Sequence, residues 1–151
     1  MTRRLRDDDG NAIVEFVYLA VLLMVPLVYV LLTVFKVQGA AYAVSSAARE
    51  AGRVYAGAPT AEGADVPPAD RAFTAASIVM ADSGLRLSPE DLHITCSATP
   101  CLTPGARVDV TIAYHVRLPL LPRFLRASAP ASVHVTGRHL EVVDRFRPGG
   151  R

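Results

Sequence analysis

One carboxylate stands at the head of the most apolar stretch of this chain. Glu15 lies between Val14 and Phe16, and the twenty residues from Phe16 to Phe35 carry no charge. A carboxylate inside a membrane helix costs about 2.5–3.5 kcal/mol on insertion scales, so such a residue usually has a function. Two interpretations stay open. Glu15 is either solvated at the membrane surface near a helix N-terminus, or paired with a cation of a neighbouring chain.

The four histidines are the other side chains that could bind a metal or catalyse a reaction. His93 and His115 fall on the polar phase of predicted strands, where an exposed imidazole needs no function. His134 and His139 are five residues apart, so they would face opposite sides of a regular strand unless a bulge intervenes. The sequence has no helical His-x-x-x-His spacing and no glycine-rich phosphate loop. We therefore expect no enzyme activity, no cofactor and no metal.

Cys96 and Cys101 are the two cysteines of the chain, and both lie far beyond the apolar run. A close pair without a third thiol fits a disulfide in an oxidising compartment. Half of a zinc site is the alternative, but no second Cys or His pair completes it. We expect a disulfide, which would contribute about 2 kcal/mol on the chain-entropy model because it closes a short loop.

The apolar run itself is expected to span a membrane. At about 1.5 Å per residue, twenty helical residues cross a hydrocarbon core of about 30 Å. Arg3, Arg4 and Arg6 precede the run, which favours a cytoplasmic N-terminus and an extracytoplasmic remainder. A cleaved secretory signal is less suitable, because its apolar region has about 7–15 residues and ends at a small-residue cleavage site. The net charge of +2 does not indicate nucleic-acid binding.

The same helix is expected to continue outside the membrane. Small apolar residues recur every three or four positions, and Gly57 followed by Pro59 provides a stop. This seam suits close helix packing, within the domain on one side and against other chains on another. Within the span, Pro26 removes a backbone hydrogen bond and predicts a kink, which is either merely tolerated or used during assembly. The seam consists of Val37, Ala40, Val44, Ala47, Ala51 and Val54.

The rest of the chain is expected to form a small α+β domain. A second helix is predicted from Asp70 to Ser83, with core residues Phe73, Ala76, Val79 and Met80 and with Ile78 out of phase by one position. Alternation of apolar and polar residues then predicts an antiparallel sheet of about three strands, beginning near Leu92, Arg107 and Ser132. In the last strand the apolar phase changes, so we expect a bulge or bend near Gly137.

The N-terminal half resembles a known family. Over residues 7–55 the chain is similar to type IV pilin-like proteins, and more narrowly to the TadE-like pseudopilins of the tight-adherence (Tad/Flp) pilus system. The resemblance is carried by Gly10–Phe16 (glycine, four residues, Glu-Phe), by Pro26 and by the alanine-rich segment Gln38–Arg53. Beyond residue 55 only the order of a helix followed by strands agrees, so the TadE and TadF types both remain open.

The resemblance implies that a prepilin peptidase cuts between Gly10 and Asn11. Glu15 would then be the fifth residue of the mature chain, and Glu15 and Phe16 would be the assembly determinant. The new amino group on Asn11 would pair with Glu15 of a neighbouring chain, and this ion pair would stabilise the correct axial alignment of the two helices. We expect a cytoplasmic leader 1–10, a transmembrane helix 11–36, its extension 37–57, a loop 58–69, an α+β domain 70–144 and a disordered tail 145–151.

The resemblance also implies a minor pilin or pseudopilin with a structural role in pilus assembly. Its partners would be the membrane, the prepilin peptidase, the inner-membrane pilus platform and other pilins, among them the major Flp pilin and a TadF-like protein. It would reside in the cytoplasmic membrane, with incorporation into a pilus left open. The alternative function is an unprocessed single-span anchor for an extracytoplasmic binding domain, in which Glu15 is incidental.

Overall fold

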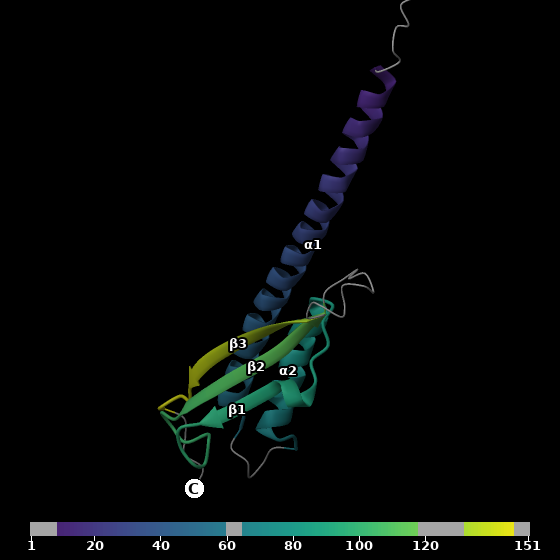
Figure 1. Ribbon diagram of the computed structural model, residues 1–151. Coiled ribbons are helices and arrows are strands. Elements are labelled where there is room, and N and C mark those ends of the chain that lie inside the picture. The colour runs from purple at the N-terminus through teal and green to yellow at the C-terminus, as the bar shows by residue number, and fades with distance from the viewer. Residues whose placement is uncertain (1–8, 60–64, 118–131, 147–151) are drawn as a thin grey trace, which may run out of the picture. The chain divides into compact units, whose positions relative to one another are not determined.

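The computed structural model describes residues 9–59, 65–117 and 132–146 (Figure 1). The chain divides into two compact units, Met1–Phe35 and Lys36–Arg151. Its α+β architecture is the expected one. The elements are the helices α1 (Asp9–Ala56) and α2 (Pro68–Asp82), a 3-10 helix (Pro89–Asp91), and the strands β1 (Leu92–Cys96), β2 (Arg107–Arg117) and β3 (Ser132–Val142).

Residues 9–35 of α1 form the described part of the first unit. Nearly all side chains from residue 12 to residue 35 are exposed, and only Tyr29 and Thr33 are half-buried. The Thr33 hydroxyl donates to the Tyr29 carbonyl oxygen at 2.8 Å, so it is satisfied within the helix. The helix continues through Pro26. This stretch is long and apolar enough to be a candidate membrane span.

In the second unit, α2 presents one narrow face to the core. Ala72, Ala76 and Met80 are buried at four-residue spacing, which is the period of a helix face. Ile78, expected with the core despite its phase, is 58% exposed. The helix ends before Gly84, whose positive φ of 70° suits a glycine in the left-handed region.

The three strands form an antiparallel sheet in the order β1-β2-β3, as expected. In the first pair Leu92 lies opposite Ile112, and in the second Arg107 lies opposite Val142. Residues 36–56 of α1 cover one face of the sheet together with α2 (Figure 1). Strand β2 runs through the middle of this core and supplies Val108, Val110 and Ile112, which are fully buried.

Of the bulge or bend expected near Gly137, the bulge is absent. Pairing between β2 and β3 is unbroken, and Gly137 lies directly opposite Ile112. A Cβ atom on Gly137 would lie 2.8 Å from the backbone of Val44, so this glycine allows α1 to approach β3 closely. The change of apolar phase has another cause. Leu140 and Val142 face outward and are 51% and 44% exposed.

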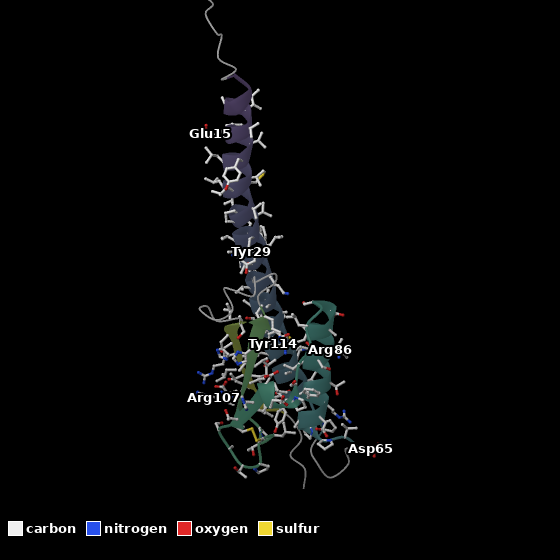
Figure 2. All side chains as sticks on the ribbon, turned by 45° about the vertical axis from the view of Figure 1, so that its right-hand side comes forward. Glu15, Tyr29, Asp65, Arg86, Arg107 and Tyr114 are labelled. Atoms are coloured by element: carbon white, nitrogen blue, oxygen red, sulfur yellow. A yellow bond between two sulfur atoms is a disulfide. The ribbon has the colours of Figure 1, made fainter. Side chains whose placement is uncertain are left out.

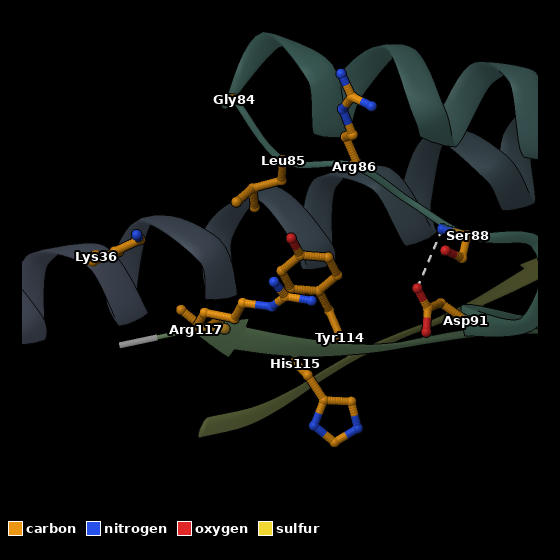
Figure 3. Close-up of a pocket in the computed structure, with 10 residues that line it drawn as sticks. Lys36, Gly84, Leu85, Arg86, Ser88, Asp91, Tyr114, His115 and Arg117 are labelled. Atoms are coloured by element: carbon orange, nitrogen blue, oxygen red, sulfur yellow. Dashed lines mark hydrogen bonds between the residues drawn. The ribbon is translucent and has the colours of Figure 1, made fainter. Parts of the chain in front are cut away.

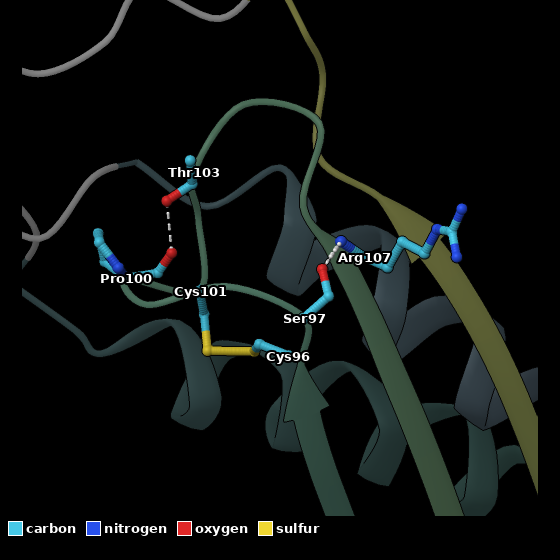
Figure 4. The surroundings of a disulfide bond; sticks show 6 residues. All are labelled: Cys96, Ser97, Pro100, Cys101, Thr103 and Arg107. Carbon is cyan, nitrogen blue, oxygen red and sulfur yellow. Dashed lines mark hydrogen bonds between the residues drawn. A yellow bond between two sulfur atoms is a disulfide. The ribbon is translucent and has the colours of Figure 1, made fainter.

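The loop after β1 is closed by the expected disulfide between Cys96 and Cys101, with a Cα–Cα distance of 5.3 Å (Figure 4). The Arg107 amide donates to the Ser97 hydroxyl oxygen at 2.8 Å, which joins the start of this loop to β2. The Thr103 hydroxyl donates to the Pro100 carbonyl oxygen at 2.6 Å. The disulfide therefore closes a short turn at the edge of the core. Most of the buried core residues belong to α1, α2 and β2, so the disulfide adds to a core formed by other elements.

Candidate assembly interface

The expected processing pair, Gly10 and Asn11, lies in the first turn of α1, which begins at Asp9. Leader residues 1–8 are outside the described part of the chain, as are residues 60–64 of the expected loop and residues 147–151 of the expected tail. The helix thus starts before the expected cut. Cleavage after Gly10 would remove its first two residues and make Asn11 the new start.

Glu15 projects from α1 as an exposed side chain (Figure 2). It forms no hydrogen bond or ion pair with any residue that the structure describes. The favourable field of a helix N-terminus falls off within the first turn, and Glu15 stands six residues after Asp9. In the uncut chain the helix dipole therefore gives this carboxylate little stabilisation.

The residues next to Glu15 are large, apolar and exposed. Ile13, Val14 and Phe16 are all more than half exposed, and Phe16 reaches 73%. Apolar side chains of this size are stabilised by lipid or by another apolar helix. The head of α1 therefore combines one carboxylate with a continuous apolar surface.

Tyr18, Tyr29 and Thr33 are the three remaining polar side chains between Phe16 and Phe35, and the sequence reading did not single them out. At 3.6 residues per turn, all three lie within about 60° of Glu15 around the helix axis. We call Glu15, Tyr18, Tyr29 and Thr33 the polar stripe. The helical phase of these residues was the available signal, and polar groups along one face of a membrane helix commonly meet another helix.

Tyr29 adds a structural observation to the polar stripe. Its hydroxyl is buried and has no hydrogen-bond partner within the described residues. A buried hydroxyl without a partner costs free energy, and the cost is larger in a lipid environment that offers no water. Tyr29 (marked in Figure 2) thus has a hydroxyl without a described partner, but because that hydroxyl is already covered it is not a free contact for another chain.

The seam of small residues packs within its own domain. Ala40, Val44, Ala47 and Ala51 are buried, whereas Val37 and Val54 at the two ends are half-buried. The four buried residues are therefore not free to contact another chain. On another face of the same helix segment, Tyr42 is 76% exposed. Arg53 pairs with Glu50 at 2.6 Å on this helix, and the hydrogen bond from Arg53 lowers the pKa of Glu50.

Of the four histidines, His93, His115 and His134 lie on the outward face of the sheet and His139 lies on the inward face. His115 and His134 are opposite each other on the outward face, with ring centroids 4.9 Å apart. His139 lies on the inward face, where its Nε2 is 3.1 Å from a Glu141 carboxylate oxygen. Within the described ranges, no three His, Cys, Asp or Glu side chains are grouped so that they could hold a metal ion.

The inward pair of His139 and Glu141 lies beside Gly52 of α1. A Cβ atom on Gly52 would lie 3.2 Å from the His139 ring and 3.5 Å from the Glu141 Cβ. Two polar side chains thus occupy core-facing positions of β3 that an alternating pattern assigns to apolar residues. Their contact with each other satisfies one polar atom of each side chain. The absence of a side chain at Gly52 leaves the space that they occupy.

In comparisons with protein-family models, with curated proteins and with solved structures, nothing matches this chain.

Proposed function

We propose that this chain is a minor pilin-like subunit, of the TadE-like type, that takes part in assembly of a Tad/Flp-type pilus. In this function a prepilin peptidase removes residues 1–10 on the cytoplasmic side. The remaining chain, anchored by the first part of α1, joins other pilins and the inner-membrane platform through its helix. The disulfide-bonded domain lies outside the cytoplasm.

The observation that carries the proposal is Glu15, an exposed carboxylate at the head of an apolar helix with no partner among the described residues. Processing would supply the missing cation, because it creates an amino group on Asn11. In a low-dielectric environment an amine and a carboxylate on neighbouring helices attract strongly, and a carboxylate left unpaired is costly. Assembly in the correct register therefore stabilises Glu15, and assembly in a wrong register does not.

The polar stripe supports the same function. Tyr18, Tyr29 and Thr33 continue the face of Glu15 along the span. A hydrogen bond across two membrane helices contributes about 0.6 kcal/mol on average. The polar stripe therefore favours one face of the helix for the contact with a neighbouring helix. The charge pair at Glu15 contributes most of the free-energy difference between the correct axial alignment of the two helices and other alignments.

The disulfide supports the extracytoplasmic position of the domain. Structural disulfides persist in oxidising compartments and are rare in the cytoplasm. Cys96 and Cys101 both belong to the second unit, on the far side of the apolar run from Arg3, Arg4 and Arg6. Basic residues close to a span favour the cytoplasmic side, so both features favour the same orientation.

The second candidate function is an unprocessed, membrane-anchored binding domain. It is favoured by the outward face of the sheet, where Leu140 and Val142 are exposed beside each other on alternate positions of β3. This function needs no cleavage and no partner for Glu15. The two candidates therefore differ at the N-terminus of the mature protein.

Intact-mass spectrometry of the purified full-length protein separates them. From cells that carry a prepilin peptidase we expect a chain that begins at Asn11, and from cells without the peptidase a chain that retains residues 1–10. If the leader is still present in both, the processed pilin-like function is wrong.

A substitution at Glu15 tests the register role separately. Glu15→Gln keeps the size of the side chain and removes its charge, so we expect normal processing and loss of pilus assembly, scored by electron microscopy of sheared filaments. Glu90→Gln makes the same chemical change at an exposed position in the domain and should leave assembly unchanged. If the Glu15→Gln variant forms normal pili, the charge of this carboxylate is not needed for assembly and its proposed role is wrong.

A further inference from the structure

A cavity of about 550 Å³ opens in the second unit among three elements that are distant in the sequence (Figure 3). One wall is the start of the domain part of α1, the second is the extended segment after α2, and the third is the C-terminal end of β2. Its charged and aromatic lining residues are Lys36, Arg86, Asp91, Tyr114, His115 and Arg117. We call this cavity the basic pocket.

The basic pocket carries three cations and one acid. Lys36, Arg86 and Arg117 each come from a different wall, and none forms an ion pair or hydrogen bond with another described residue. Asp91 is already engaged, because its carboxylate accepts the Ser88 amide hydrogen at 3.2 Å. Three cations and one carboxylate leave this concave site with a net positive charge, and the resulting potential favours an anionic ligand. Arginine in particular matches the oxygens of a phosphate group.

The floor of the basic pocket is apolar. The ring of Tyr114 rises from β2 toward Leu85, while the ring of His115 points to the opposite side of the strand (Figure 3). Val116 is buried beside them. A cationic rim above an aromatic and aliphatic floor suits a ligand that joins a phosphate to a less polar part. A bare phosphate ion would use the rim alone.

The place of Lys36 in the chain indicates the source of that ligand. Lys36 follows Phe35 directly and is the first charged residue after the uncharged run. When that run spans the hydrocarbon core, Lys36 lies at the level of the lipid phosphates, where lysine side chains commonly reach the headgroups. A pocket that includes Lys36 is therefore within reach of a phospholipid headgroup.

We propose that the basic pocket binds the headgroup of an anionic phospholipid whose phosphodiester carries no compensating cation, as in phosphatidylglycerol. Arg117, whose guanidinium lies beside the Tyr114 ring, contacts the phosphate oxygens, Lys36 and Arg86 add positive charge around the site, and Tyr114 packs against the glycerol part. The proposal depends on membrane anchoring but not on processing or pilus assembly. An unprocessed protein would still bind the lipid.

Native mass spectrometry of the full-length protein, delipidated in a neutral detergent, tests the proposal. The probes are phosphatidylglycerol, phosphatidylcholine with the same acyl chains, and inorganic phosphate as a competitor. We expect phosphatidylglycerol to bind at least about tenfold more tightly than phosphatidylcholine. A basic residue near a charged lipid contributes about a fivefold change in affinity, so Arg117→Gln and Arg86→Gln should each weaken phosphatidylglycerol binding by about that factor.

Arg107→Gln is the matched control. Arg107 and Arg117 are both exposed arginines at opposite ends of β2, and Arg107 does not line the pocket. The control removes the same charge and should change phosphatidylglycerol affinity by less than about twofold. Should Arg117→Gln fail to fold, as judged by thermal unfolding, Arg86→Gln and Lys36→Gln carry the comparison.

Three results would overturn the proposal. Equal weakening by Arg117→Gln and Arg107→Gln would show attraction by net charge and not by the pocket. Equal binding of phosphatidylcholine would show that the headgroup charge is not recognised. Displacement of phosphatidylglycerol by an equal concentration of inorganic phosphate would assign the pocket to the free ion.

Discussion

The two halves of α1 belong to one continuous helix, yet they follow opposite rules of composition. Up to Phe35 the side chains are mostly large, apolar and exposed, with valine and leucine predominating. From Lys36 onward the buried positions hold small residues, chiefly alanine. Large exposed side chains suit a surface that lipid or a partner covers, whereas small ones suit close contact with a sheet. Residue size, more than apolarity, distinguishes the two environments.

The largest expected effect comes from truncating the core against which the second half packs. Ile112 is fully buried in β2, so Ile112→Ala should lower the free energy of unfolding by about 2–5 kcal/mol through lost burial and a cavity. The same measurement, denaturant unfolding of the full chain in detergent, should give less than about 0.5 kcal/mol for Leu22→Ala in the exposed half. If the two variants lose similar amounts of unfolding free energy, the two halves of α1 do not differ in their packing as described.

The next effect concerns the close approach that the small residues allow. Gly137→Ala places a Cβ atom against the Val44 backbone, and overpacking of this kind costs about 1–3 kcal/mol. Gly39→Ala is the control, because a Cβ atom there meets nothing within 4 Å. In an α-helix this second change should be neutral or stabilising. Equal stability of the two variants would show that β3 and α1 have room to separate.

A smaller effect is expected at the edge of the core, where the disulfide closes its loop. Replacing Cys96 and Cys101 together with serine should reduce the free energy of unfolding by about 2 kcal/mol and leave the fold intact. Thermal unfolding with and without a reductant checks this value. A reductant effect that persists in the double variant could not come from this bridge.

The smallest effect should come from the outward face of the sheet. Arg138 forms a hydrogen-bonded ion pair with Asp109, which lowers the pKa of that carboxyl below its ordinary value of 3.8. A carboxyl with a lowered folded-state pKa contributes stability above its unfolded pKa, and this contribution is lost as the pH falls through the folded value. We therefore expect Arg138→Gln to flatten the pH dependence of thermal unfolding below about pH 4, with little change at neutral pH. A variant that keeps the full acid dependence would exclude this pair as its source.

Much of the fold could be predicted from the sequence because its periods are strong. The spacing of three and four in α1 and the alternation in β2 each belong to one type of element. Gly137 was misread because a glycine in a strand serves either a bulge or a close backbone contact, and only the position of Val44 decides between them. The polar residues His139 and Glu141 on the core side of β3 then made the apolar phase misleading.

The candidate sites were predictable to different degrees. Glu15 was evident because it is a charged residue beside a long uncharged run. The cysteine pair was evident because the chain has two cysteines and they lie five residues apart. The polar stripe could have been found from helical phase alone. The basic pocket could not, since Lys36, Arg86 and Arg117 come from three separate elements and no local pattern joins them. Contacts of this kind depend on the tertiary arrangement, which a single sequence does not specify.

The alanines of α1 have a geometric consequence for the second unit. Since Ala43, Ala47, Ala48 and Ala51 add almost no thickness between helix and sheet, the domain keeps a small radius on that side of its helix. A larger side chain at any of these positions would push the helix away from the sheet. The other side chains that meet across this contact would then also lose their packing.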